Sequence, residues 1–266
     1  MKPELADLIT LARQAGEILR AGYGQVQHIT HKSEIDLVTE YDHQSEAYLL
    51  GEIRQRFPGH SIVSEESGLS AGSKSQIWYV DPLDGTVNFA HGVPIFTVSL
   101  AYAEDGQVVL GVVYDPTRDE CFSAERGHGA WLGEHRLHVS TADALIRSLL
   151  VTGFPYDVKT NPANNLAEHA RFSMVTRGVR RLGSAALDLC YVAAGRLDGF
   201  WELRLNAWDI AAGALIAEEA GAYLGIAVDG GGEPVSAGEL LAPPCSILAS
   251  APGIYAEMRR VLFEEE

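Results

Sequence analysis

Hydrophobic positions recur at helical spacing in two stretches near the start of the chain. Apolar residues three and four positions apart over 3–21 predict an amphipathic helix that ends at Gly22 and Gly24. A second helix is predicted over 40–57, where Pro58-Gly59 ends it. The chain therefore opens with two helices, each with one face to bury.

Short apolar runs then predict strands up to about residue 140, since each run is bounded by turn residues. Glu104-Asp105-Gly106 lies between two of these runs and is typical of a hairpin turn. The predicted strands cover 61–63, 77–80, 97–102, 108–114, 121–124 and 130–132.

From about residue 145 the pattern alternates again between strands and helices. Gly221 follows an alanine-rich helix at the position that favours a left-handed backbone. The strands are predicted at 149–152 and 199–202, and the helices at 164–175, 185–194, 207–220 and 254–263. With no linker or repeat between the halves, we expect a single α/β domain over 1–266, with lobes of approximately 1–145 and 146–266.

Composition and charge narrow the possible partners. Among 266 residues, 20 are Lys or Arg and 36 are Asp or Glu, so the net charge is −16. This excess argues against nucleic acid or an anionic membrane as the main partner, because both favour clustered cations. A small anionic ligand stays possible, since a bound cation reverses the local field. The 47% hydrophobic share is enough for a sizeable core.

Three cysteines without a CxxC pair predict neither a disulfide framework nor a zinc site. The first residues lack the continuous apolar run of a signal peptide, and no apolar stretch is long enough to cross a membrane. A cytoplasmic location is the expectation.

The segment 81–89, Asp-Pro-Leu-Asp-Gly-Thr-Val-Asn-Phe, directly follows an apolar strand. Asp81 and Asp84 could both face one hard cation such as Mg²⁺, which prefers oxygen ligands. Gly85 permits close backbone approach, and the N–H groups after it could receive phosphate oxygens. The same letters also make a good turn, so a metal site and a simple turn both stay open here.

Three further acidic clusters stand at element boundaries. Glu65-Glu66 follows a strand and is either a ligand pair or a solvated loop. Thr39 and Asp42 have the spacing of a helix capping box, and Asp42 could alternatively serve catalysis. Asp209 opens an apolar helix, where the helix dipole favours an acid, but a buried acid also needs a partner such as a metal.

Taken together, the four clusters resemble the inositol monophosphatase family of Mg²⁺-dependent, lithium-sensitive phosphatases. The family patterns D-P-[IL]-D-G-T-x-N-F, S-E-E, K-x-x-x-D-L-V-T-x-x-D and W-D-x-A-A-G occur at 81–89, 64–66, 32–42 and 208–213. The resemblance implies the layered α-β-α-β-α sandwich of the inositol monophosphatase and fructose-1,6-bisphosphatase type, an α/β fold (α+β in some schemes). It also implies a homodimer.

By resemblance, two to three Mg²⁺ ions are expected. The first is expected at Glu65, Asp81 and the backbone carbonyl of Leu83. The second is expected at Asp81, Asp84 and Asp209, with Asp81 shared between the two ions. A third, weaker ion is expected near Glu65. Such ions would neutralise the acids, hold a phosphate dianion and make a water acidic enough to attack.

The remaining site residues are implied in the same way. Thr86, hydrogen-bonded to Asp42, is expected to orient the water. Glu66 is expected to support Glu65 rather than bind metal. The expected substrate contacts are Asp84, Gly85, Thr86, Gly183, Ser184, Ala185 and Glu202.

The resemblance implies a small phosphorylated polyol such as myo-inositol monophosphate as the substrate, and a carboxylate at Glu202 suits such a substrate because it can accept hydrogen bonds from hydroxyls. Histidinol phosphate, fructose 1,6-bisphosphate and 3′-phosphoadenosine 5′-phosphate stay open as alternatives for the same chemistry. A regulatory binding protein with the same fold is the alternative from a different class. Arg204 has no assigned role.

Overall fold

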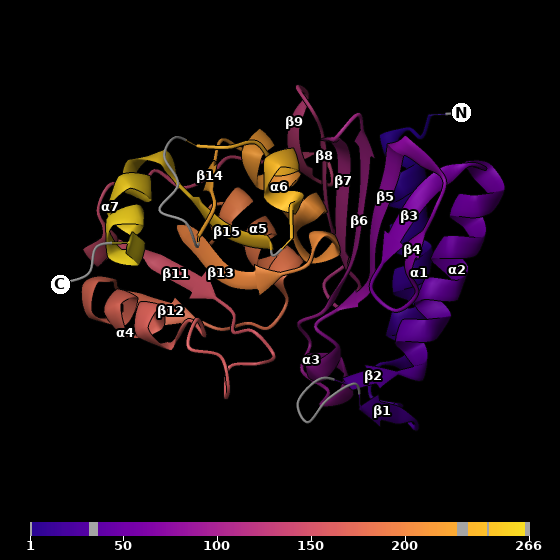
Figure 1. The fold of residues 1–266 in the computed structure, drawn as a ribbon, viewed down its shortest axis with the longest axis horizontal. Helices are drawn as coiled ribbons and strands as arrows, with labels where there is room; N and C mark the ends of the chain where they lie inside the picture. The colour runs from indigo at the N-terminus through magenta and orange to yellow at the C-terminus, as the bar shows by residue number, and fades with distance from the viewer. Residues whose placement is uncertain (1, 32–36, 228–233, 244, 264–266) are drawn as a thin grey trace.

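The computed structural model describes residues 2–31, 37–227, 234–243 and 245–263. The part of the acidic motif at 32–36 lies outside these ranges. The two predicted N-terminal helices, α1 (Leu5–Gly22) and α2 (Glu40–Arg56), lie side by side and form one outer layer of the molecule (Figure 1). Both helices bury their apolar faces against the same sheet.

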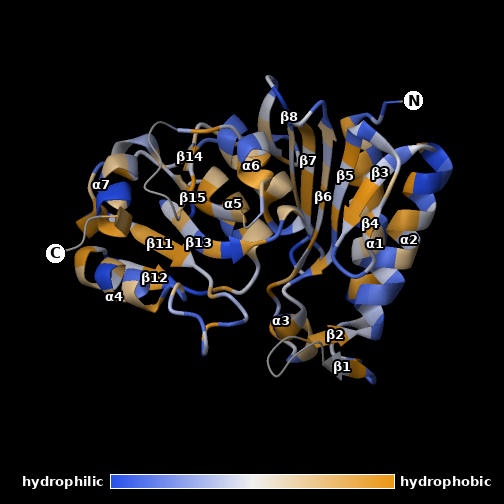
Figure 2. Ribbon diagram, in the orientation of Figure 1, coloured by the Kyte–Doolittle hydropathy of each residue, from blue (hydrophilic) through white to orange (hydrophobic). Residues whose placement is uncertain are grey.

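That sheet has the strand order β10-β9-β8-β7-β6-β5-β3-β4 and is antiparallel except where β3 pairs with β5. Its strands are β3 (His60–Ser64), β4 (Gly68–Ser70), β5 (Ser73–Asp84), β6 (Thr97–Glu104), β7 (Gln107–Asp115), β8 (Glu120–Glu125), β9 (Gly129–Leu132) and β10 (His135–Arg136). Hydrophobic residues are concentrated along its central strands, whereas α2 presents many hydrophilic ones (Figure 2).

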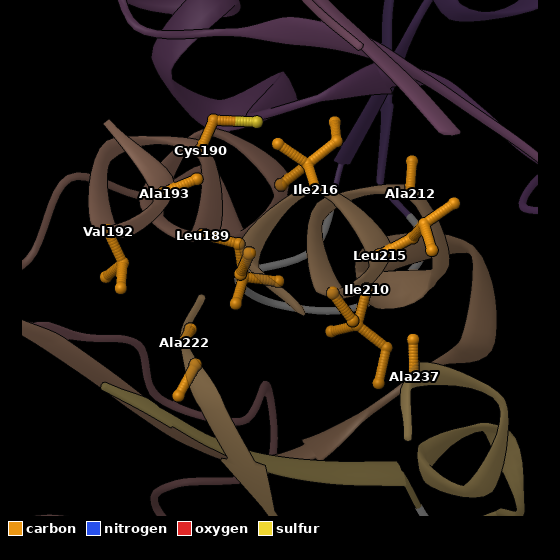
Figure 3. Close-up of a cluster of buried hydrophobic side chains, with 14 of the residues drawn as sticks. Leu189, Cys190, Val192, Ala193, Ile210, Ala212, Leu215, Ile216, Ala222 and Ala237 are labelled. Atoms are coloured by element: carbon orange, nitrogen blue, oxygen red, sulfur yellow. The ribbon is translucent and has the colours of Figure 1, made fainter. Parts of the chain in front are cut away.

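Two helices, α5 (Ala185–Ala193) and α6 (Ala207–Glu219), fill the middle layer between the two large sheets. Their apolar side chains meet in one core cluster (Figure 3). Small residues allow this packing, because a Cβ atom on Gly111 of β7 would lie 3.0 Å from the Ala212 carbonyl oxygen. A Cβ atom on Gly213 would similarly lie 2.8 Å from the Leu189 side chain.

The second sheet has the order β12-β11-β13-β15-β14 and is covered on its far side by α4 (Leu166–Val175) and α7 (Pro252–Phe263) (Figure 1). Its strands are β11 (Leu149–Thr152), β12 (Gly178–Arg180), β13 (Gly199–Leu205), β14 (Tyr223–Gly225) and β15 (Cys245–Ser250). The layers therefore run α-β-α-β-α, which confirms the predicted fold class.

The sequence pattern missed the shortest elements. These are the two-stranded pair β1 (Ile29–His31) and β2 (Leu37–Thr39), the short strands β4, β10 and β12, helix α3 (Thr86–Ala90), and the 3₁₀ turns η1 (Leu145–Arg147) and η2 (Ala237–Leu241). The predicted left-handed residue after α6 is confirmed, since Gly221 has φ +96°.

The three cysteines are buried and free. Among the described residues, no helix is both long enough and apolar enough to cross a membrane.

Candidate active site

A cavity of about 300 Å³ lies where β5 ends, between the two large sheets. Eleven residues predicted from the sequence line it: Glu65, Asp81, Leu83, Asp84, Gly85, Thr86, Gly183, Ser184, Ala185, Glu202 and Asp209. They come from segments far apart in the sequence, so the fold brings the separate acidic clusters to one place.

The end of β5 bulges between its two aspartates. The pairing with β6 shifts register between Asp81 and Asp84, and the Leu83 N–H donates to Asp81 Oδ1 at 3.0 Å. Gly85 then takes φ +96°, and a Cβ atom there would lie 2.9 Å from the Ile95 carbonyl oxygen. The simple-turn interpretation of this segment is therefore wrong, because the chain continues as a bulged strand that leads into α3.

Asp84 is tied to the start of α5. Its Oδ2 atom accepts from Ser184 Oγ at 2.6 Å and from the Ala186 N–H at 2.8 Å. Nearby, Asn88 Nδ2 donates to the Ile95 carbonyl at 2.9 Å and to the Leu182 carbonyl at 2.8 Å. These bonds fasten the segment that carries the aspartates to the loop before α5.

Asp42 caps α2 and also contacts Thr86, so the capping box does not exclude the second interpretation of this residue. Its Oδ2 atom accepts from the Thr39 N–H at 2.8 Å, which caps α2. Its Oδ1 atom accepts from Thr86 Oγ1 at 2.9 Å. Because the carboxylate has two oxygens, the capping bond and the bond to Thr86 coexist.

Asp209 stands at the third position of α6, in a capping box with Asn206. Its Oδ2 atom accepts from the Asn206 N–H at 2.7 Å. Glu65 approaches from the turn after β3, and its own N–H donates to the Val80 carbonyl at 3.2 Å. A turn of the first sheet and a helix of the middle layer thus present acids to the same cavity.

The carboxyl groups at the cavity are buried close together, so their pKa values are raised. Burial raises the pKa of Asp81, and the nearby carboxylates of Glu65, Asp84 and Asp209 raise it further. Burial also raises the pKa of Asp84 to about 6 and that of Asp209 well above its usual value. Such a cluster stores unfavourable charge that a cation would relieve.

The substrate side of the cavity contains two further buried acids. Burial raises the pKa of Glu202 to about 8, with the Asp84 charge as the next cause. Asp188, which the sequence analysis did not single out, is 1% exposed and lines the cavity. Its Oδ1 atom has no hydrogen-bond partner among the described residues. The available signal was the one used for Asp209, an acid within an otherwise apolar helix.

Glycine makes room for Glu202. A Cβ atom on Gly153, at the end of β11, would lie 2.1 Å from Glu202 Oε1. The loop that follows contributes Phe154 and Tyr156 to the cavity wall. Arg204, which had no predicted role, has φ +62° and forms an ion pair of 3.1 Å with Asp157 of this loop. That ion pair fastens the loop to β13.

Residues 1–265 match the family model described as the inositol monophosphatase family. The chain belongs to this family. An inositol-1-monophosphatase of Mesorhizobium japonicum is 42% identical over 238 residues, which cover 88% of this chain and 89% of the relative. A relative from Pasteurella multocida, named Nus factor SuhB, is 44% identical over 263 residues and 97% of this chain, covering 95% of the relative.

The solved structures agree with this family membership. The extragenic suppressor protein suhB of Bartonella henselae superposes with a TM-score of 0.88 at 37% identity, covering 97% of this chain and 98% of that one. The protein is thus an enzyme of the inositol monophosphatase family, a phosphatase whose substrates are small phosphate monoesters.

Proposed function

We propose that this phosphatase uses Mg²⁺ to hydrolyse myo-inositol monophosphate, or a similar small polyol phosphate, to the alcohol and inorganic phosphate. The observation that supports it most strongly is the gathering of four carboxyl groups at one cavity, directly beside the Thr86–Asp42 hydrogen bond. The name of the relative from Mesorhizobium japonicum favours inositol monophosphate as the first substrate to test.

The donor set fits Mg²⁺, which prefers carboxylate and carbonyl oxygens. Asp81, Asp84 and Asp209 each use one oxygen to accept a hydrogen bond from the protein, and each has a second oxygen that could turn to a cation. In the described ranges no three His, Cys, Asp or Glu side chains already converge on a single point, so these carboxylates would have to rotate toward the ion.

We assign the ligands accordingly. Glu65, Asp81 and the Leu83 carbonyl would hold one ion, with a weaker ion near Glu65. Asp81 would be shared with a second ion held by Asp84 and Asp209. When bound, the ions would supply the positive charge that holds a phosphate dianion and that makes a water acidic enough to attack it.

The protein's own groups would orient the reactants. Thr86 Oγ1 lies within donating distance of Asp42 Oδ1 at 2.9 Å and of the Leu83 carbonyl at 3.0 Å. Because its one hydrogen points toward these acceptors, the Thr86 oxygen would accept a hydrogen bond from the attacking water. The Gly85 and Thr86 N–H groups would donate to the phosphate oxygens. Glu66 lies in the turn beside Glu65 and would support that turn.

The opposite wall would hold the alcohol. Glu202 is 8% exposed and lines the cavity with the loop formed by Gly183, Ser184 and Ala185. A buried carboxyl group can accept hydrogen bonds from ring hydroxyls, and Asp84 could also contact one of them. This wall decides which alcohol fits.

A substrate panel tests the proposal. Phosphate release from inositol monophosphate should require Mg²⁺ and be inhibited by lithium, with a higher kcat/KM than for histidinol phosphate, fructose 1,6-bisphosphate or 3′-phosphoadenosine 5′-phosphate. A higher value for one of the other three would reassign the substrate. Release that is equal without Mg²⁺ would refute the metal mechanism.

A matched pair of variants tests the site. Asp84→Asn should lower kcat by orders of magnitude, because it removes a charge from the cavity. Asp115→Asn is the control, since Asp115 is also buried and accepts backbone N–H bonds, from Thr117 and Arg118, outside the cavity lining. The control should keep most of the wild-type rate. Full activity in Asp84→Asn would refute the assignment.

A regulatory binding role is the second candidate, favoured by the relative named Nus factor SuhB. It predicts that the Asp84→Asn chain rescues a cell that lacks this protein. Failure of that rescue, with rescue by Asp115→Asn, would support a purely enzymatic role.

We further propose a homodimer of single-domain chains with lobes that meet near residue 145, in the cytoplasm. Light scattering of the purified protein measures the oligomeric state.

A further inference from the structure

One face of α2 reaches three different segments of the candidate active site. Asp42, Ser45 and Glu46 are 0%, 0% and 5% exposed. Their spacing of three and four residues places them on the same side of the helix. Asp42 holds Thr86, as described above. Ser45 and Glu46 form hydrogen bonds to two other segments.

Glu46 holds the turn that carries Glu65. Its Oε1 atom accepts from the Glu66 N–H at 3.2 Å, from the Ser67 N–H at 3.0 Å and from Ser64 Oγ. Its Oε2 atom accepts from Ser67 Oγ at 2.6 Å. The four donors lie on both sides of Glu65, so the Glu46 carboxylate fixes the backbone from which the Glu65 side chain projects.

Ser45 holds the neighbouring segment of β5. Its Oγ atom donates to the Pro82 carbonyl at 2.8 Å, between Asp81 and Leu83. This bond orients the Pro82–Leu83 peptide, and the Leu83 carbonyl follows in the chain. Ser45 and Glu46 therefore fix, from adjacent positions of one rigid helix, the two segments whose acids repel each other.

We propose that Ser45 and Glu46 are positioning residues for the metal ligands, Glu46 for Glu65 and Ser45 for the Leu83 carbonyl. The inference rests on the proposed function. Glu65 and Asp81 repel each other when no cation lies between them, so an anchor is needed to keep the turn after β3 close to β5. Hydrogen bonds to a buried carboxylate are strong enough for this purpose.

The test compares Mg²⁺ binding, measured by titration calorimetry, in the wild type and in three variants. Glu46→Ala should weaken Mg²⁺ binding by at least about tenfold, as loss of a group that supports a metal ligand commonly does. Ser45→Ala should weaken it less, since it removes a single bond. Glu46→Gln should restore most of the affinity, because its amide oxygen can accept from the same backbone N–H groups and its NH₂ group can donate to Ser67 Oγ.

Glu219→Ala is the matched control. Glu219 also holds a turn through a carboxylate, with Oε1 on the Gly127 N–H and Oε2 on the Gly129 N–H, both at 2.8 Å. That turn does not belong to the cavity lining. The control should leave Mg²⁺ affinity unchanged.

Unchanged affinity in Glu46→Ala, or an equal loss in Glu219→Ala, would overturn the proposal. If Glu46→Ala does not fold, Ser45→Ala and Glu46→Gln test the proposal in its place. Wild-type Mg²⁺ affinity in Ser45→Ala together with a tenfold loss of affinity in Glu46→Gln would overturn the proposal. Calorimetry needs no substrate. A wild-type protein that binds Mg²⁺ but hydrolyses no member of the substrate panel would refute the proposed function and leave the positioning role to be judged by binding alone.

Discussion

Replacing Asp209 with Asn separates the charge of this side chain from its structural bond. Asp209 Oδ2 accepts from the Asn206 N–H at 2.7 Å, and an Asn oxygen can take the same bond. The cap of α6 therefore survives in Asp209→Asn. In Asp209→Ala the bond from the Asn206 N–H is lost, which costs about 1 kcal/mol. Only the charge differs between Asp209→Asn and the wild type.

The expected magnitude follows from linkage. An ion present at 100 times its dissociation constant stabilises the folded state by about 2.7 kcal/mol. For a chain of this length each kcal/mol moves the melting temperature by roughly 2–4 °C, so one ion corresponds to roughly 5–11 °C. Asp209→Asn should lose the gain from the second ion and keep that from the first.

Calorimetric melting without Mg²⁺ measures the effect of the lost hydrogen bond on the melting temperature, and melting with Mg²⁺ measures the gain from the bound ions. Without Mg²⁺, Asp209→Asn should melt at or above the wild-type temperature, because one repelling charge is gone, whereas Asp209→Ala should melt roughly 2–4 °C below Asp209→Asn. With Mg²⁺, the gain of both variants should be smaller than that of the wild type. An equal Mg²⁺-dependent gain in the wild type and Asp209→Asn would refute the assignment of Asp209 as a ligand.

Three further outcomes are expected. Burial raises the pKa of Asp188 above its unfolded value, so its stabilising contribution is complete below about pH 4 and is lost as the pH rises through the folded pKa. In metal-free protein the melting temperature of Asp188→Asn relative to wild type should therefore increase from pH 4 to pH 8, and a constant difference would contradict this. Gly153→Ala should raise KM for a polyol phosphate, since its Cβ atom displaces Glu202, while the melting temperature changes little; an unchanged KM would show that Glu202 does not bind the alcohol. Phe172→Ala should lower the free energy of unfolding by about 3–5 kcal/mol in denaturant titrations, because the buried Phe172 ring packs against Trp201 with the ring centroids 4.0 Å apart. A loss under about 1 kcal/mol would mean that the surrounding side chains fill the gap.

The long elements were predictable because their periodicity is local. Helices α1 and α2 and strand β11 agree with the predicted ranges to within a residue or two. Helix α3 has only five residues, which is too short for a periodic pattern. The three-residue strand β12 exists because it pairs with β11, and such pairing is decided by distant residues.

The candidate site was likewise predictable only where its signals are local in the sequence. Most of its acids were identified from motifs, and the structure brings Glu65, Asp81, Asp84, Glu202 and Asp209 to the lining of one cavity, whereas Asp42 and Glu66 do not line it. The bond between Thr86 and Asp42 was expected only from the family resemblance, and the bond between Ser67 and Glu46 was not predicted at all, since both pairs meet only through the tertiary fold. Asp188 carried the signal that was used for Asp209, an acid in an apolar helix, but its place in the cavity follows only from the tertiary fold.

Asp84 accepts its hydrogen bonds from Ser184 and Ala186, which follow it in the chain by 100 and 102 residues. Asp81 and Asp84 leave the ribosome long before Asp209, and the strand that carries them can pair with its neighbours at once. These acids meet only where α6 lies against the first sheet, because Asp209 belongs to α6 whereas Asp81 and Asp84 belong to β5. A nascent chain therefore meets this repulsion only after Asp209 has been made, more than 120 residues after Asp84. Refolding experiments should find that activity returns after the helical signal has reached its final value.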